Sequence, residues 1–125
     1  MKVGVLMGSA NDGDKMRAAT ETLEAFGIEA DVRVLSAHRN PTEVVELVSS
    51  ARDNGYVAFI CGAGMAAHLA GVVAAHTTLP VVGVPLSGGA LNGVDALYSV
   101  VQMLAIGDAD LAVRLAEDRR RRAQP

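Results

Sequence analysis

The chain has 125 residues, half of them hydrophobic, and a formal net charge of −3 at pH 7. This length suits one ordinary domain, spanning 1–125, and the negative balance gives no reason to expect a nucleic-acid partner. Aromatic residues make up only 3% of the chain and glycines number 13, so the core must consist of closely packed Ala, Val and Leu. Such a core is typical of helices on a parallel sheet and argues against an aromatic-rich β-sandwich.

Cys61 is the only cysteine, which excludes an internal disulfide and a thiolate metal cluster. It ends the apolar run YVAFIC and is expected to be a small buried residue. The chain opens directly on a strand-like run, without a signal peptide, and no apolar stretch is long enough to cross a bilayer. We therefore expect a cytoplasmic protein with no membrane partner. The arginines at 119–122 are interpreted as a solvated helix end.

Strand-like and helix-like segments alternate along the chain. The strand-like runs lie at 2–7, 29–35, 56–61 and 80–85. A first helix follows the apolar spacing from Met16 to Phe26 and ends at Gly27, while Asn40 and Pro41 predict the N-cap and first turn of a second. A third helix at 64–76 is small and apolar nearly all round, so it is expected to be buried on both sides. A fourth begins near Gly93.

This alternation predicts right-handed βαβ units and a parallel sheet, whose ligands bind at the carboxyl ends of the strands. The segments that follow the strands are GSAND at 8–12, SAHRN at 36–40, GAGMAAH at 62–68 and LSGGALNG at 86–93. All are rich in Gly, Ser, Asn, Asp or His, and all should gather at one edge of the sheet. The convergence of these loops, more than any single motif, predicts a binding site.

The first loop has two readings that its residues leave open. Ser9 and the backbone N–H groups that open a helix favour a phosphate or ribose contact. Simple helix capping by Asn11 or Asp12 explains the same residues equally well. The spacing matches neither a dinucleotide fingerprint nor a P-loop.

The second and third loops carry the candidates for chemistry. Arg39 can grip a phosphate, and His38 can act as an acid or base near neutral pH, although a lone loop histidine is more often inert. In the third loop, Gly and Ala residues allow a backbone to approach a ligand closely. His68 is interpreted as a core histidine bonded to a carbonyl, and His76 as a residue that suits a helix end. The histidines lack any known metal spacing, so no metal is expected.

With these residues laid out, the chain resembles class I PurE, in the AIR carboxylase family. The family pattern contains GSxSD, SAHR followed by one residue and Pro, GAGGAAHLPG, and a stretch close to LSGVDSLYSIVQMP. The chain carries GSAND at 8–12, SAHRNP at 36–41, GAGMAAHLAG at 62–71 and LNGVDALYSVVQM at 91–103. The likeness runs without gaps from residue 2 to about residue 103, and four motifs in one order make it specific.

The resemblance implies a flavodoxin-like three-layer αβα fold assembled as a homo-octamer. It also implies a mutase of purine biosynthesis that interconverts N5-carboxyaminoimidazole ribonucleotide and its C4-carboxylated isomer by releasing and recapturing CO2, without a metal or organic cofactor. His38 would carry the proton, and Arg39 would hold the phosphate. The implied substrate-binding set is Ser9, Asp12, Ser36, Ala37, Arg39, Gly64, Ala66, His68 and Leu69.

The chain departs from the family pattern at three places. Met65 replaces a glycine, Ala70 replaces a proline, and the residues after Met103 lack the family's proline-glycine loop. One alignment sets 104–107 on the end of a fifth strand. The preferred one continues a helix from 94 to 106, so that the fifth strand is missing and 104–125 is a helical, basic tail. Two alternatives stay open: a carboxylase or decarboxylase acting on another nucleotide, and a non-catalytic nucleotide-binding module.

Overall fold

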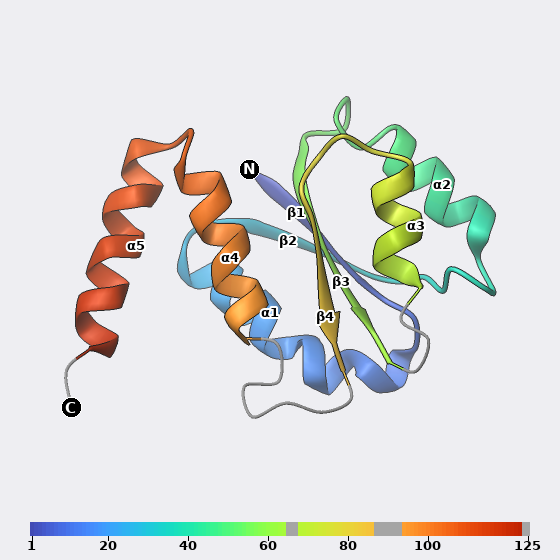
Figure 1. Cartoon of the computed structure of the whole chain (residues 1–125), viewed down its shortest axis with the longest axis horizontal. Helices are drawn as coiled ribbons and strands as arrows, with labels where there is room; N and C mark the ends of the chain where they lie inside the picture. The colour runs from blue at the N-terminus through green and yellow to red at the C-terminus, as the bar shows by residue number, and fades with distance from the viewer. Residues whose placement is uncertain (65–67, 87–93, 124–125) are drawn as a thin grey trace.

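The chain folds as a parallel sheet with helices on both faces (Figure 1). The computed structural model describes residues 1–64, 68–86 and 94–123. Its strands are β1 (Lys2–Met7), β2 (Glu29–Val34), β3 (Tyr56–Ala63) and β4 (Val81–Pro85), in the order β2-β1-β3-β4. Its helices are the short 3-10 helix η1 (Ala10–Asp12), α1 (Gly13–Ala25), α2 (Pro41–Ser49), α3 (Leu69–Ala75), α4 (Val94–Ala105) and α5 (Ala109–Arg122). The predicted α/β class with a parallel sheet is confirmed, and the observed strand order is the one typical of flavodoxin-like sheets.

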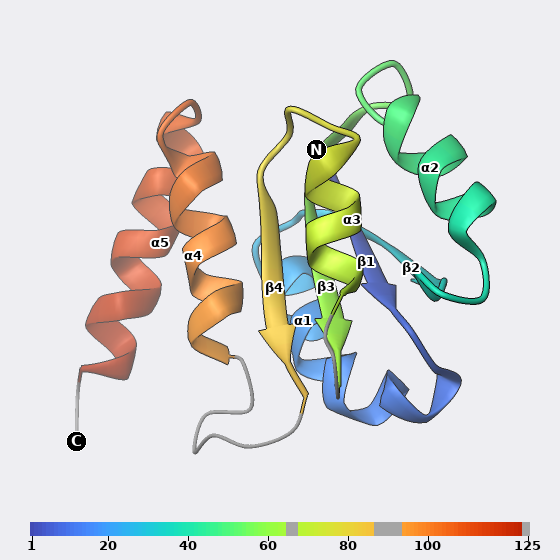
Figure 2. The same cartoon turned by 45° about the vertical axis from the view of Figure 1, so that its right-hand side comes forward.

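The strand side chains divide between two apolar cores because successive residues point to opposite faces of the sheet. Val3, Val5 and Met7 of β1 face a core that α1, α4 and α5 complete. Leu6 of the same strand faces a second core, with α2 and α3 on the other side of the sheet. Figure 2 shows these layers, with α4 and α5 side by side at one end of the molecule.

Local signals at the first two helices act largely as predicted. Gly27 ends the first helix with φ 72°, a conformation that glycine adopts without a Cβ penalty. The N–H of Gly27 donates to the backbone carbonyl of Glu24, and that of Ile28 donates to the backbone carbonyl of Leu23, each at 2.9 Å. Pro41 opens α2 as expected, but Asn40 makes no side-chain capping bond to the helix.

The third helix differs from its prediction. It begins at Leu69 and ends at Ala75, which makes it shorter than the expected 64–76. Leu69 and Val73 are buried against the sheet, whereas Gly71, Ala74 and Ala75 are exposed. The expectation of burial on both sides is therefore wrong for a single copy of the chain, since α2 covers only part of α3.

The C-terminal region follows the preferred alignment. Leu104 lies in α4 and not in a strand, and the described residues contain four strands in the sheet. Helix α5 then turns back along α4, with Leu111 and Leu115 buried in the core that α4 shares. Arg119 donates to Gln102 at 3.0 Å and the Arg122 guanidinium lies 4.4 Å from the centre of the Tyr98 ring. The basic run is thus a helix end, as predicted.

Candidate functional site

A pocket of about 530 Å³ opens where the loops after β1, β2 and β3 meet. This volume is in the range of small-molecule sites. The lining residues are Gly8, Ser9, Asn11, Asp12, Ser36, Ala37, His38, Ala63, Gly64, His68 and Leu69. The predicted convergence of the first three loops is therefore present. Of the fourth loop, residues 87–93 lie outside the described part of the chain.

The hydroxyl of Ser36 shapes the second loop. Its Oγ accepts hydrogen bonds from the backbone N–H of His38 at 3.2 Å and from that of Arg39 at 3.3 Å. Asn40 closes the turn, since its N–H donates to the Ser36 carbonyl at 2.8 Å and its Oδ1 accepts from the Ser36 N–H at 3.3 Å. Ser36 is only 9% exposed. This turn fixes the backbone from which His38 projects into the pocket.

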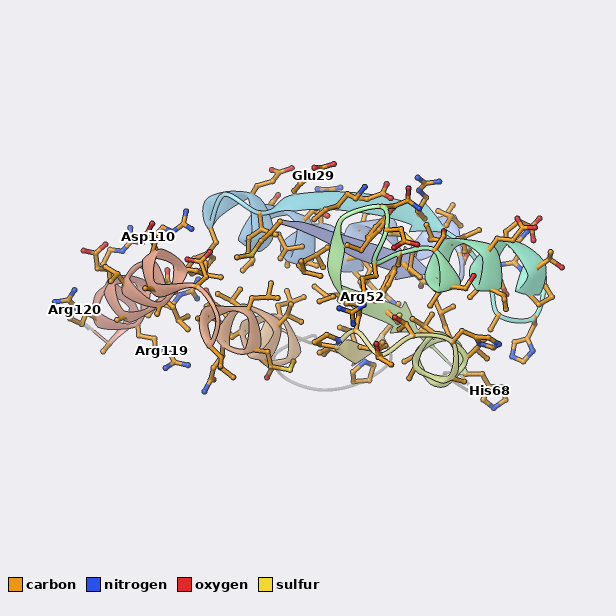
Figure 3. The ribbon with its side chains drawn as sticks, turned by 90° about the horizontal axis from the view of Figure 1, so that it is seen from above. Glu29, Arg52, His68, Asp110, Arg119 and Arg120 are labelled. Carbon is orange, nitrogen blue, oxygen red and sulfur yellow. The ribbon has the colours of Figure 1, made fainter. Side chains whose placement is uncertain are left out.

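His38 and His68 face each other across the pocket. The Nε2 atom of His38 lies 3.1 Å from the Nδ1 atom of His68, which is hydrogen-bonding distance. Both side chains are exposed, and Figure 3 shows His68 directed away from the sheet. The interpretation of His68 as a core histidine inside a helix is wrong, because α3 starts one residue later and leaves His68 at its N-cap position.

The first loop is capped by Ser9 and not by the residues expected. The Ser9 Oγ accepts from the Asn11 N–H at 3.3 Å at the start of η1. Asp12 stands at the N-cap position of α1 but makes no side-chain capping bond to the helix. It lines the pocket. Its carboxylate therefore lies at the pocket without capping the helix. Capping by Asn11 or Asp12, one of the two readings of this loop, is not what the structure shows.

Arg39 links the first two loops without lining the pocket. Its guanidinium donates to the carbonyl of Gly8, and its side chain is exposed. The only positive side chain of the second loop therefore stands beside the first, next to Ser9 and the start of η1. An anion placed there would meet both the guanidinium and the N–H groups of that turn.

The structure brings most of the predicted site residues together, but not all of them. All members of the predicted set that the structure describes line the pocket except Arg39, and Ala66 lies outside the described residues, as does Met65. The predicted set did not include Gly8, Asn11 and Ala63, which line the pocket, or Asn40, which closes the second loop. The pairing of Ser36 with Asn40 four residues later was the available signal for that turn.

Two further features bear on the site. Cys61 lies buried behind it, and burial raises the pKa of its thiol to about 12, so this residue is an inert core group as expected. Over the described ranges, no three His, Cys, Asp or Glu side chains are grouped as metal ligands. No described helix is both long enough and apolar enough to cross a membrane.

Comparison with known proteins agrees with this geometry. The sequence profile described as AIR carboxylase matches residues 2–121, which is nearly the whole chain. The chain belongs to the AIR carboxylase family. The match includes α4 and most of α5, so the residues after Met103 lie within the family's region of similarity.

Named relatives in the AIR carboxylase family are similar over most of the chain. The N5-carboxyaminoimidazole ribonucleotide mutase of Vibrio vulnificus is 49% identical over 120 residues, which is 90% of this chain and 74% of that protein. The mutase of the same name from Aquifex aeolicus is 48% identical, over 91% of this chain and 73% of its own length. That of Escherichia coli K12 is 46% identical, over 89% and 70%.

Solved structures support the fold. Treponema denticola PurE aligns with a TM-score of 0.86 and 21% identity, covering 98% of this chain and 92% of that one. A singly substituted PurE2 from the same organism aligns with a TM-score of 0.87 and 20% identity, covering 98% of this chain and 91% of that one. This likeness confirms that the sheet, the flanking helices and the C-terminal pair follow a known architecture.

Proposed function

We propose that this chain is an N5-carboxyaminoimidazole ribonucleotide mutase of purine biosynthesis. The observation that carries the proposal is the His38 imidazole in a pocket lined by the family's three loop motifs. Relatives that bear this name are 46–49% identical to the chain. The substrate is a ribonucleotide with a carboxylate on the exocyclic nitrogen, and the product carries that carboxylate on C4 of the ring.

His38 moves the proton that this isomerisation requires. The protonated imidazole gives its proton to the exocyclic nitrogen as the N-carboxylate leaves as CO2. C4 of the resulting aminoimidazole then attacks the same CO2, and neutral His38 removes the proton from C4. One proton enters and one leaves, so His38 returns to its starting state and no cofactor takes part. General acid–base catalysis of this kind contributes about 10²–10⁴-fold.

Residues of the three loop motifs hold the substrate. Ser9 and Asp12 of the first loop bind the ribose, and Arg39 of the second loop, which reaches the first through its bond to the Gly8 carbonyl, binds the phosphate. Ser36, Ala37, Gly64, Ala66 and Leu69 frame the base and the departing CO2. The small side chains of the third loop let the backbone approach the ring and keep CO2 close to C4 after it leaves.

His68 acts here as a positioning residue. A hydrogen bond between Nδ1 of His68 and Nε2 of His38, at 3.1 Å, fixes the tilt of the catalytic ring. The ring planes meet at 57°, so the contact is a hydrogen bond and not a stacked pair.

We further propose that the protein works in the cytoplasm as a homo-oligomer, the octamer implied by the family.

The deciding experiment follows the conversion of N5-carboxyaminoimidazole ribonucleotide by ultraviolet absorbance. The unmodified chain should turn over, and His38→Asn should lose at least about 100-fold in rate while still binding the nucleotide in calorimetry. His76→Asn is the matched control, because His76 is exposed, does not line the pocket, and its side chain bonds to the Val72 carbonyl at 2.9 Å. Turnover that survives His38→Asn, or no turnover by the unmodified chain, would contradict the proposal.

A further inference from the structure

β2 forms an open edge of the sheet. It pairs with β1 on one side, and no further strand of the described residues lies on the other. Figure 3 shows β2 along one long side of the molecule, near the labelled Glu29, with no described helix beyond it. A sheet edge of this kind presents unpaired N–H and C=O groups to its surroundings.

The outward groups belong to alternate residues of β2. The N–H of Glu29 donates to the Met1 carbonyl at 3.1 Å and that of Leu35 to the Met7 carbonyl at 2.8 Å. Odd-numbered residues therefore turn their backbone groups toward β1. The N–H and C=O of the even-numbered residues between them point outward: Ala30, Val32 and Val34.

The same even-numbered residues carry an uncovered apolar face. Val32 lies beside Val5 and Val34 beside Met7 in the sheet, on the face whose β1 members are buried. Yet Val32 is 45% exposed and Val34 is 49% exposed. Natural edges are commonly protected by charged side chains, lysine above all, by proline or by a bulge. β2 contains no lysine or proline, its pairing with β1 is regular throughout, and its charged residues Glu29, Asp31 and Arg33 lie on the face opposite the two valines.

We propose that β2 pairs antiparallel with β2 of a second copy of this chain, around a twofold axis at Val32. In this arrangement Val32 lies opposite Val32 of the partner subunit, and the outward backbone groups of the two strands exchange hydrogen bonds. Ala30 lies opposite Val34 of the partner subunit, so the exposed valines cover each other. The two sheets become one continuous sheet.

Charge selects this register over its neighbours. Asp31 and Arg33 lie on the other face of β2. Within one chain, Nε of Arg33 lies 3.1 Å from Oδ1 of Asp31. With the axis at Val32, each Asp31 lies opposite Arg33 of the partner subunit. Moving the axis one residue either way keeps the hydrogen-bond pattern. An axis at residue 31 sets Asp31 against Asp31, although it also sets Glu29 against Arg33 of the partner subunit, and an axis at residue 33 sets Arg33 against Arg33. The axis at Val32 is the one of the three without a like-charge pair. Directly opposed like charges destabilise a strand pair, whereas opposite charges stabilise it.

This inference specifies one surface of the proposed homo-oligomer and depends on no step of the proposed reaction. Its first test is disulfide formation by Val32→Cys, with Val34→Cys as the matched control. At an axis through residue 32, the two new cysteines lie within the Cα separation of about 4.4–6.8 Å that a disulfide allows. Residues 34 of the two copies lie roughly 13 Å apart, at about 3.3 Å per residue. The buried Cys61 does not compete.

We expect Val32→Cys to give a disulfide-linked dimer under mild oxidation at least tenfold faster than Val34→Cys. Equal rates, or faster linkage at position 34, would overturn the proposed register. The rates are read on non-reducing gels, so the outcome is the same whether or not the chain turns over the ribonucleotide. Failure of the interface and failure of the proposed function are thus distinguishable.

The second test adds a charge change to Val32→Cys. Arg33→Glu replaces each favourable cross-strand pair with two acidic groups and should slow linkage by about tenfold. Arg17→Glu makes the same charge change on α1, where Arg17 is exposed and paired with Asp14, and should leave linkage unchanged. An Arg33→Glu chain that links as fast as the Arg17→Glu chain would refute the pairing of Asp31 with Arg33.

Discussion

The Nε2 atom of His38 and the Nδ1 atom of His68 lie 3.1 Å apart, although the residues are 30 positions apart in the chain. Only one hydrogen can occupy the space between these nitrogens. A protonated His38 donates the hydrogen bond to His68. A neutral His38 can accept the bond instead, when the hydrogen is on Nδ1 of His68. The pair therefore links the protonation state of the proposed catalyst to a fixed ring orientation.

Removing this contact should slow the reaction without weakening substrate binding. His68→Leu deletes the hydrogen bond, and the loss of about 1 kcal/mol corresponds to roughly fivefold in kcat. His68→Asn places an amide where Nδ1 stands and should restore most of the rate. Steady-state kinetics on both variants separate kcat from KM. A rise in KM with kcat unchanged would show that His68 contacts the substrate and does not position His38.

The sequence predicted the elements of this site better than its contacts. Strand ends, Gly27 and Pro41 are local signals, because a hydrophobic run, a positive φ or a fixed proline ring acts within a few residues. The gathering of loops at one sheet edge follows from parallel topology alone. His68 was misplaced because its partner comes from a different loop, and no local pattern encodes that distance.

The roles of Ser36 and Asn40 show the same limit. Asn40 before Pro41 is a typical capping pattern, yet its side chain bonds to Ser36 instead of the helix. A residue with several possible partners is decided by the fold around it. The residues alone offered His38 as a candidate, and the resemblance to PurE added Ser36 and His68, but the hydrogen bonds among their loops required the three-dimensional structure.

Gly4 should be intolerant of even a methyl group. A Cβ at Gly4 would lie 2.4 Å from Cδ1 of Phe59, whose fully buried ring crosses the strand at this point. Overpacking of this kind costs about 1–3 kcal/mol. Gly4→Ala should lower the free energy of unfolding by that amount in urea titrations. Gly71→Ala is the control: its Cβ meets nothing within 4 Å, and alanine in a helix gains about 0.5–1 kcal/mol.

The start of α5 depends on Asp108. Its Oδ1 accepts from the Leu111 N–H at 2.9 Å, which satisfies one of the free donors of the first turn. Asp108→Ala should lower the free energy of unfolding by about 1 kcal/mol. Asp110→Ala also removes an acid from this turn but leaves the capping bond intact, so its effect should be smaller. Equal losses in urea titrations would assign the stabilisation to charge at the helix end instead of the cap.

The pH dependence of stability should report the Tyr56–Asp31 hydrogen bond. Burial first, and then this bond to the carboxylate, raise the pKa of Tyr56 to about 12. A phenol whose folded pKa lies above its ordinary value of 10 stabilises the protein fully below pH 10. That contribution is lost as the pH rises from about 10 to 12, and Tyr56→Phe should lack this loss.

The acidic limb follows from Asp31. Burial alone would raise the pKa of its carboxyl, but hydrogen bonds from Tyr56 and Arg33 outweigh burial and hold the pKa below 3.8. The resulting stabilisation is present above pH 3.8 and is lost as the pH falls toward the folded pKa. Tyr56→Phe removes one of these bonds, so its free energy of unfolding should fall less steeply over this range.

A matched control separates this bond from the general loss of a tyrosine hydroxyl. At pH 7, Tyr56→Phe should cost about 1.5–3 kcal/mol, the usual value for a hydrogen bond to a charged group. Among the described residues, the hydroxyl of Tyr98 is buried and has no hydrogen-bond partner. Tyr98→Phe should therefore be neutral or stabilising. Unfolding in urea at pH 7 and at pH 11 measures both effects, and identical behaviour of the two variants would show that the Asp31 bond contributes nothing to stability.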